Sequence, residues 1–265
     1  MHYTEDALGQ IEESVVTMRF RYYDLIMKLG AFGNTLKNER AKEYIAHGVT
    51  RRLCVLYRCF ENIFKLFPAD KAERLTDEAR MDLEINLHAF LINTYGIIEN
   101  LGLSLAFENG ILNSGTSEKR TKNEIGLFKS KFRKQLNSTL RDYLRRSEST
   151  SWYNDYAKNY RDALAHRIPP YIPPSGLDKE EQKQFEQLNR ELTSLSKQGY
   201  SERYSVIIDQ LTNLGKASPF YVHSFSENAK PVYIHPQMIA DFRTIEELIE
   251  VTISNFYVNS EKQDG

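Results

Sequence analysis

The stretch TDEARMDLEINLHAFLINTYGIIENLGLSLAFENG, residues 76–110, predicts one long helix. Thr76 precedes Asp77 and Glu78, so its hydroxyl can cap a first turn whose acidic side chains favour a helix N-terminus. Mostly apolar positions then recur at spacings of three and four, which places them on one face: Leu83, Leu87, Phe90, Thr94, Ile97, Leu101 and Leu105. Asn109-Gly110 is a typical helix stop. Because a helix with an apolar face needs partners to cover it, the stretch predicts a helical bundle.

Further helices are predicted on both sides of this stretch. They are expected from Thr4 to Gly30 or Gly33, over 39–67 and 122–146, from Ser149 or Ser151 to His166, and over 178–197, 201–214 and 238–258. The segments PFYVHSF (219–225) and PVYIHP (231–236) are expected to form a hairpin. We therefore predict an all-α fold in a single domain over 1–265, a helical bundle with additional helices and one small β-hairpin near the C-terminus.

Composition excludes several classes of function. The formal net charge is −1, so any binding of nucleic acid has to be local. Cys54 and Cys59 are five residues apart on a predicted helix, where their side chains diverge, and they do not form a metal site. There is no P-loop, dinucleotide-binding glycine motif or nucleophile elbow, so no cofactor and no metal is expected. Without an apolar run of about 18 to 20 residues, we expect a soluble cytoplasmic protein with no membrane span.

The segment YAKNYRDALAHRIPPYIPP, residues 156–174, sets a short helical stretch directly before two pairs of prolines. One face of this fifth helix is apolar: Trp152, Tyr153, Tyr156, Tyr160, Ala163 and Leu164. Arg161, Asp162, Ala165 and His166 occupy the opposite face. Asp162 and His166 are four residues apart, so we expect the carboxylate to orient the imidazole and to favour its protonated form. The prolines predict that the helix ends at the histidine, where the carbonyl end also favours a positive charge.

The sequence RDALAH, from Arg161 to His166, resembles the R-x-x-x-x-H signature of the HEPN superfamily, and the RIPPYIPP that follows resembles one prokaryotic branch of it. The resemblance covers about residues 39–174 and leaves 175–265 as a C-terminal extension. It implies a dimeric helical bundle in which arginine and histidine from both copies meet in a cleft and cleave RNA without metal. Arg161, Asp162 and His166 are then the catalytic candidates. A branch regulated by nucleotidylation has tyrosine two residues after the histidine, where this chain has Ile168.

A basic segment precedes the motif. Between Glu118 and Arg146 ten basic residues stand against three acidic ones, a net charge of +7. The basic residues are Lys119, Arg120, Lys122, Lys129, Lys131, Arg133, Lys134, Arg141, Arg145 and Arg146. Phosphate backbones are bound largely through such local charge, so the last seven are candidates for binding nucleic acid. The alternative is an ordinary solvated helix face.

In the helix predicted over 76–110, asparagines recur every seven residues, at Asn86, Asn93 and Asn100, with Gly96 on the same side. Because asparagine and glycine both lower helix stability, this stripe needs a reason. Asn93 and Asn100 either line the cleft or belong to a buried polar seam between helices. We favour the seam, since buried polar groups commonly serve packing.

Three hypotheses for the function remain. In the first, the chain is an endoribonuclease for single-stranded RNA, and it forms a homodimer whose two-fold axis passes near Ala165. In the second, it is a non-catalytic HEPN-like scaffold that binds nucleic acid or another protein, in a defence or stress system. A purely structural helical protein is a third reading.

Overall fold

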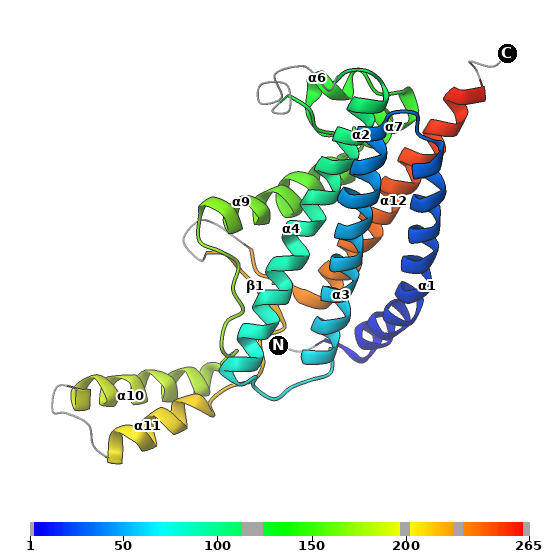
Figure 1. Cartoon of the computed structure of the whole chain (residues 1–265). Coiled ribbons are helices and arrows are strands. Elements are labelled where there is room, and N and C mark those ends of the chain that lie inside the picture. Colours follow the sequence, from blue (N-terminus) through cyan, green and yellow to red (C-terminus); the bar gives the residue numbers. More distant parts are fainter. Residues whose placement is uncertain (1–2, 113–123, 197–201, 225–229, 262–265) are drawn as a thin grey trace.

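The computed structural model describes residues 3–112, 124–196, 202–224 and 230–261. This part of the chain is almost entirely helical (Figure 1), which confirms the predicted all-α class. The long helices are α1 (Glu5–Thr35), α3 (Arg51–Leu66), α4 (Asp77–Glu108) and α12 (Ile234–Glu261). Two short elements, α2 (Glu39–Glu43) and the π-helical η1 (Tyr44–Thr50), run directly into α3, so 39–66 is a continuous helix as predicted.

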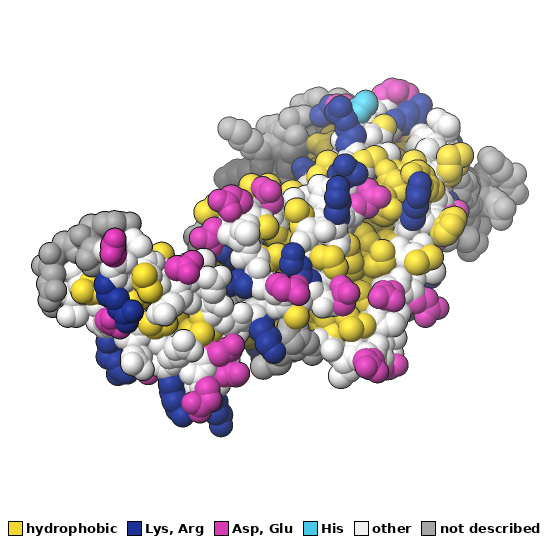
Figure 2. All heavy atoms as spheres, turned by 90° about the horizontal axis from the view of Figure 1, so that it is seen from below, with side chains coloured by type: hydrophobic (Ala, Val, Ile, Leu, Met, Phe, Trp, Pro, Cys, Tyr) yellow, Lys and Arg dark blue, Asp and Glu magenta, His cyan; other side chains and the backbone are white. Residues whose placement is uncertain are grey.

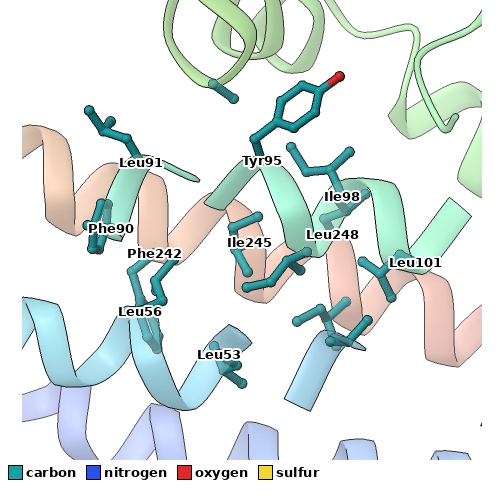
Figure 3. Close-up of a cluster of buried hydrophobic side chains, with 14 of the residues drawn as sticks. Leu53, Leu56, Phe90, Leu91, Tyr95, Ile98, Leu101, Phe242, Ile245 and Leu248 are labelled. Carbon is teal, nitrogen blue, oxygen red and sulfur yellow. The ribbon is translucent and has the colours of Figure 1, made fainter. Parts of the chain in front are cut away.

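Helix α4 holds the bundle together by packing against both α3 and α12. Every position predicted for its apolar face is buried. Figure 3 shows buried side chains of the three helices: Phe90, Ile98 and Leu101 from α4, Leu53 and Leu56 from α3, and Phe242, Ile245 and Leu248 from α12. Leu91 and Tyr95 point to the other side of α4. Of the described helices, α4 alone is long and apolar enough to cross a membrane, and 67% of its apolar window is buried inside the bundle.

Two predicted helix starts, at Thr4 and Thr76, are confirmed by their caps, whereas the motif helix starts at Ser147, before the predicted Ser149 or Ser151. Thr4 Oγ1 accepts a hydrogen bond from the Ala7 amide at 3.3 Å, and Thr76 Oγ1 accepts one from the Ala79 amide at 3.2 Å. Gly110, with a φ of 66°, follows the end of α4 in the left-handed conformation that glycine adopts without strain. Helix α1 continues through the two glycines expected to end it and stops at Thr35.

The predicted single helix over 122–146 is wrong. The described part of this region forms α6 (Ser130–Arg133) and α7 (Ser138–Tyr143), and α8 (Ser147–Ser151) begins directly after it. Asn137 separates the first two, because its side chain accepts the Leu140 amide at 3.0 Å and caps a new helix. Lys129 and Arg146 have extended backbone ψ angles, which interrupt the helix at two further positions. Burial of Phe132, Leu136 and Leu140 in the core favours these breaks over a straight basic helix.

The helix that carries the motif runs without interruption through α8, η2 (Trp152–Lys158) and α9 (Asn159–His166), and it ends at His166 as predicted. The proline-rich chain then descends beside α4, where Pro170 O lies 2.5 Å from His88 Nε2. Further on, the Ile172 amide donates to Glu84 Oε1 at 2.9 Å. The prolines therefore mark a segment fastened along α4.

The C-terminal third contains a helical hairpin and a two-stranded sheet. Helices α10 (Lys179–Ser196) and α11 (Glu202–Thr212) pack on each other and project from the body (Figure 1). The predicted β-hairpin is confirmed, with β1 (Phe220–Tyr221) antiparallel to β2 (Val232–Tyr233). Helix α12 begins at Ile234, four residues before the predicted start.

Candidate functional site

Arg161 is held against α4. Its guanidinium carbon lies 4.0 Å from the centre of the Tyr95 ring, a distance at which a cation and an aromatic face attract each other. Its Nη1 lies 3.1 Å from Asp162 Oδ1, and its side chain is 25% exposed. Burial lowers the Arg161 pKa, but Tyr95, Asp162 and Glu99 outweigh that effect and the net pKa is raised. The arginine is therefore a positioned, permanently charged group with an accessible edge.

Asp162 does not take the position expected for it. Its Oδ2 accepts a hydrogen bond from Lys158 Nζ at 2.5 Å, while Oδ1 faces Arg161. Among the described residues, Asp162 and His166 share neither a hydrogen bond nor an ion pair. Lys158, one turn earlier on the same face, reaches the carboxylate instead. The prediction that Asp162 orients the imidazole is thus corrected: Asp162 positions the cations Lys158 and Arg161.

His166 lies in the last turn of α9 and its ring is exposed. It forms no hydrogen bond with a described residue. The next residue, Arg167, donates its amide to Ala163 O at 3.0 Å and turns its guanidinium back to Asn159, 2.6 Å from Oδ1. The imidazole is therefore free to meet a ligand or a second protein surface.

Arg161 and His166 do not converge within one chain. Residues five apart on an α-helix point about 140° from each other and are about 7.5 Å apart along its axis. In agreement with this, Arg161 contacts Tyr95 of α4 whereas His166 faces outward. A site that uses both side chains on one ligand needs a second copy of the helix.

The seven basic candidates differ in their contacts and in their exposure. Arg133 donates to the Leu144 carbonyl at 3.2 Å, Arg146 lies over the Tyr143 ring at 5.3 Å, and Lys131 lies 3.8 Å from Glu124. Lys134 and Arg145 are exposed, whereas Lys129 and Arg141 are partly buried. The other basic residues of the segment, Lys119, Arg120 and Lys122, fall outside the described residues.

This basic surface and the motif lie at opposite ends of one helix. From α8 to α9 the chain advances twenty residues, about 30 Å at 1.5 Å per residue. Within one chain, the basic segment that precedes the motif in the sequence therefore does not adjoin it in space. Only a strand long enough to follow the helix would reach both.

The asparagine stripe forms the polar seam, not a cleft. Asn86 Oδ1 accepts from Asn62 Nδ2 at 2.9 Å, and Asn93 Oδ1 accepts from Arg52 Nη1 at 3.1 Å, so both face α3. Asn100 packs against Gly48 in η1, where an added Cβ would lie 2.8 Å from the asparagine amide nitrogen. Asn93 and Asn100 are thus removed from the candidate site.

An uncovered apolar face lies beside the motif. Met81, Ile85 and Ile92 of α4 are 56%, 65% and 40% exposed, and their spacing of four and seven places them on one stripe. This stripe lies between the α4 side chains that face α3 and those that contact α9 and the proline-rich segment. Ile168, two residues after His166, is also exposed. We call Met81, Ile85, Ile92 and Ile168 the α4–α9 face.

A pocket of about 760 Å³ lies on another side of the motif helix. Its lining includes Tyr156, Tyr160, Tyr233 and Gln237, but not Arg161, Asp162 or His166. The motif therefore lies on an open surface and not in this pocket.

Two buried titratable groups, His235 and Asp241, lie on α12. His235 Nε2 is 2.6 Å from Phe67 O and Nδ1 is 3.1 Å from the Tyr3 hydroxyl; burial lowers its pKa to about 4. Asp241 Oδ1 accepts from Trp152 Nε1 and from Gln237 Nε2, each at 2.7 Å. Burial raises the Asp241 pKa to about 6, partly offset by these two donors. Both groups join α12 to distant parts of the chain.

Two residues of the arginine environment were not among the predicted site residues, Tyr95 and Glu99 of α4. They are four residues apart and therefore share the face that meets α9. Their spacing is visible in the sequence, but the partner helix is not. The structure therefore extends the candidate site from α9 onto α4.

Searches among family models, curated proteins and solved structures found no match for this chain.

Proposed function

We propose that this chain is a metal-independent endoribonuclease of HEPN type, acting on single-stranded RNA at a site shared by two copies. The observation that carries the proposal is the pairing, on the last turns of α9, of a positioned arginine with an exposed histidine at R-x-x-x-x-H spacing. The two side chains diverge within one chain, and an apolar surface suited to a second copy lies beside them.

The dimer forms through the α4–α9 face. A two-fold axis near Ala165 sets this small exposed residue against its counterpart and lets the helices approach closely. The exposed side chains of Ile85 and Ile92 are then covered by the partner, which removes apolar surface from water. Two copies of His166 and two of Arg161 border the resulting cleft.

The chemistry follows from what the RNA strand supplies. The 2'-hydroxyl oxygen attacks the adjacent phosphorus as a proton passes to one His166, and the bond to the 5'-oxygen breaks as that oxygen receives a proton from an imidazolium. The products are a 2',3'-cyclic phosphate and a 5'-hydroxyl. Arg161 stabilises the negative charge that builds on the phosphoryl oxygens, and Tyr95 and Asp162 hold the guanidinium in place beforehand.

The basic surface holds the strand away from the reacting phosphate. Lys134 and Arg145 are exposed and available to phosphates, and counterion release makes their contribution fall with salt. Since this surface lies about 30 Å from His166 along the helix, we expect long RNAs to be cut better than short ones.

The test is incubation of the protein with a labelled single-stranded RNA and with DNA of the same sequence, both in a metal chelator. RNA fragments ending in 2',3'-cyclic phosphate and starting with 5'-hydroxyl are expected, and the DNA should stay intact because it lacks the nucleophile. Fragments that start with 5'-phosphate, or cleavage of the DNA, would contradict the mechanism.

The scaffold remains the second candidate because Lys158, Asp162 and Arg161 form a charge network that would also suit a purely structural interface. Under that alternative the protein binds RNA or a protein partner without cutting RNA. Equal RNA binding by the native chain and by His166→Ala, with no cleavage by either, would favour it.

A further inference from the structure

Helix α1 carries a second uncovered apolar stripe. Val16, Phe20, Tyr23 and Met27 are 67%, 73%, 53% and 74% exposed. Their spacing of four, three and four residues places them on one face of the helix. Figure 2 shows how hydrophobic side chains gather over a broad area of the helical body in the view from below. We call these four residues the α1 stripe.

The α1 stripe does not contribute to the packing of α1 on the bundle. Its opposite face already anchors α1 to the bundle through Met18, Leu25 and Leu29, each at most 1% exposed. Beneath the stripe, Tyr22 stacks on Tyr57 of α3 with ring centres 4.1 Å apart. A rigid, apolar and exposed stripe of this kind is typical of a protein interface.

The α1 stripe is also distinct from the α4–α9 face. In Figure 1, α1 runs along one edge of the bundle and α9 lies at the other, with α3 and α4 between them. One partner copy seated near Ala165 would therefore leave the α1 stripe exposed.

We propose that a second copy of this chain covers the α1 stripe, with the two α1 helices antiparallel around a two-fold axis between residues 21 and 22. The spacing of the stripe reads the same in both directions, so this axis sets Val16 level with the partner's Met27 and Phe20 level with the partner's Tyr23. The same register sets Glu13 within two residues of the level of the partner's Lys28, on one flank of the contact. Such self-complementarity is what an isologous contact requires.

Charge favours the antiparallel arrangement. The exposed acids Glu5, Asp6, Glu12 and Glu13 occupy the N-terminal part of α1, and the exposed cations Arg19, Arg21 and Lys28 occupy its C-terminal part, with Asp24 as the one exposed acid there. In the antiparallel register Glu13 lies within two residues of the level of the partner's Lys28, whereas a parallel pair sets Glu13 beside Glu13 and Lys28 beside Lys28. Within its own chain Lys28 also pairs with Asp24 and Glu250, at 2.7 and 2.6 Å, and Arg21 pairs with Glu246 at 2.8 Å.

The first test uses disulfide cross-linking in a chain with Cys54→Ser, since Cys54 is exposed and Cys59 is buried. Val16→Cys and Met27→Cys are prepared separately, one with a size tag, and are oxidised alone and mixed. In the antiparallel register, two copies of residue 16 are about 16 Å apart along the helices, far beyond the 4.4–6.8 Å between Cα atoms that a disulfide spans. Cross-links are therefore expected only in the mixture. Cross-linking of Val16→Cys with itself, or no cross-link in the mixture, would overturn the proposal.

The second test measures mass in solution. We expect the native chain to have at least twice its mass of 30.9 kDa at micromolar concentration. The double variant Phe20→Glu with Met27→Glu should halve the native mass. Val206→Glu with Ile208→Glu, at sites on α11 that are 46% and 40% exposed, is the control with a matching charge and should leave the mass unchanged. A monomeric native chain, or a folded double variant with the native mass, would refute the α1 contact. The α1 contact can be tested separately from RNA cleavage. Ile85→Glu with Ile92→Glu should disrupt the α4–α9 face and leave the α1 contact intact.

Discussion

His235 and Asp241 should make opposite contributions to the pH dependence of stability. Folding lowers the His235 pKa from 6.5 to about 4, so its contribution is fully present above pH 6.5 and is lost as the pH falls toward 4. Folding raises the Asp241 pKa from 3.8 to about 6, so the folded state gains stability over the same descent as the carboxyl takes up a proton. The two effects largely cancel in the native chain.

Single variants separate the two contributions. At 1.36 kcal/mol per pKa unit, acidification from pH 7 to about pH 4.5 removes about 2.5 kcal/mol through His235 and adds about 2 kcal/mol through Asp241. Over this change, His235→Gln should therefore gain about 2.5 kcal/mol of unfolding free energy relative to the native chain, and Asp241→Asn should lose about 2 kcal/mol relative to it.

Urea unfolding followed by circular dichroism, at both pH values, measures these differences. Gln can keep the contact with Phe67 O, and Asn can keep its oxygen toward Trp152, so each variant removes the titration with little change in packing. If both variants keep the native pH dependence, the burial argument for these two groups is wrong.

Two further predictions concern the seam and the arginine. Gly96→Ala should lower the free energy of unfolding by about 1 kcal/mol, because a Cβ at this position would lie 2.6 Å from the Arg52 guanidinium and break its hydrogen bond to Asn93. Gly9→Ala, with open space around it, should raise the free energy of unfolding by about 0.5–1 kcal/mol. Urea unfolding measures both changes, and equal effects would contradict the prediction. Tyr95→Leu should lower the kcat of RNA cleavage about tenfold, because it releases Arg161. Tyr95→Phe keeps the ring, so its kcat should stay within about twofold of the native value. Single-turnover kinetics measure both, and equal losses in the two variants would show that the ring does not hold Arg161.

The parts of the fold that depend on local rules were predictable from the sequence. The caps at Thr4 and Thr76, the buried face of α4 and the end of α9 at His166 each rest on residues within one or two turns. The start of α12 was misplaced for a local reason too. The segment PVYIHP predicts a strand that ends at Pro236, but Pro236 lies in the first turn of a helix, where its missing N–H costs nothing.

The arrangement of the candidate site was less predictable because it depends on which helix lies opposite. On a helical wheel we predict Arg161 and His166 on one face, although residues five apart on a helix point about 140° from each other, and Tyr95 of α4 holds the guanidinium on its own side. The same wheel paired Asp162 with His166, although Lys158 competes for the carboxylate from the opposite direction. The prediction of one helix over 122–146 is wrong for a related reason. A count of charges does not show that Phe132 and Leu140 are buried and that the chain forms short helices around them.

The central claim is that His166 cuts RNA without metal, and the most direct measurement compares three purified proteins on one labelled single-stranded RNA in a chelator. The native chain and the control His47→Ala, which alters another exposed histidine on a different helix, should cut at the same rate. His166→Ala should lose a factor of about 10² to 10⁴, the usual contribution of a proton-transferring group, while its circular dichroism stays native. Equal cleavage by the native chain and His166→Ala, or loss of cleavage in His47→Ala as well, would contradict the account.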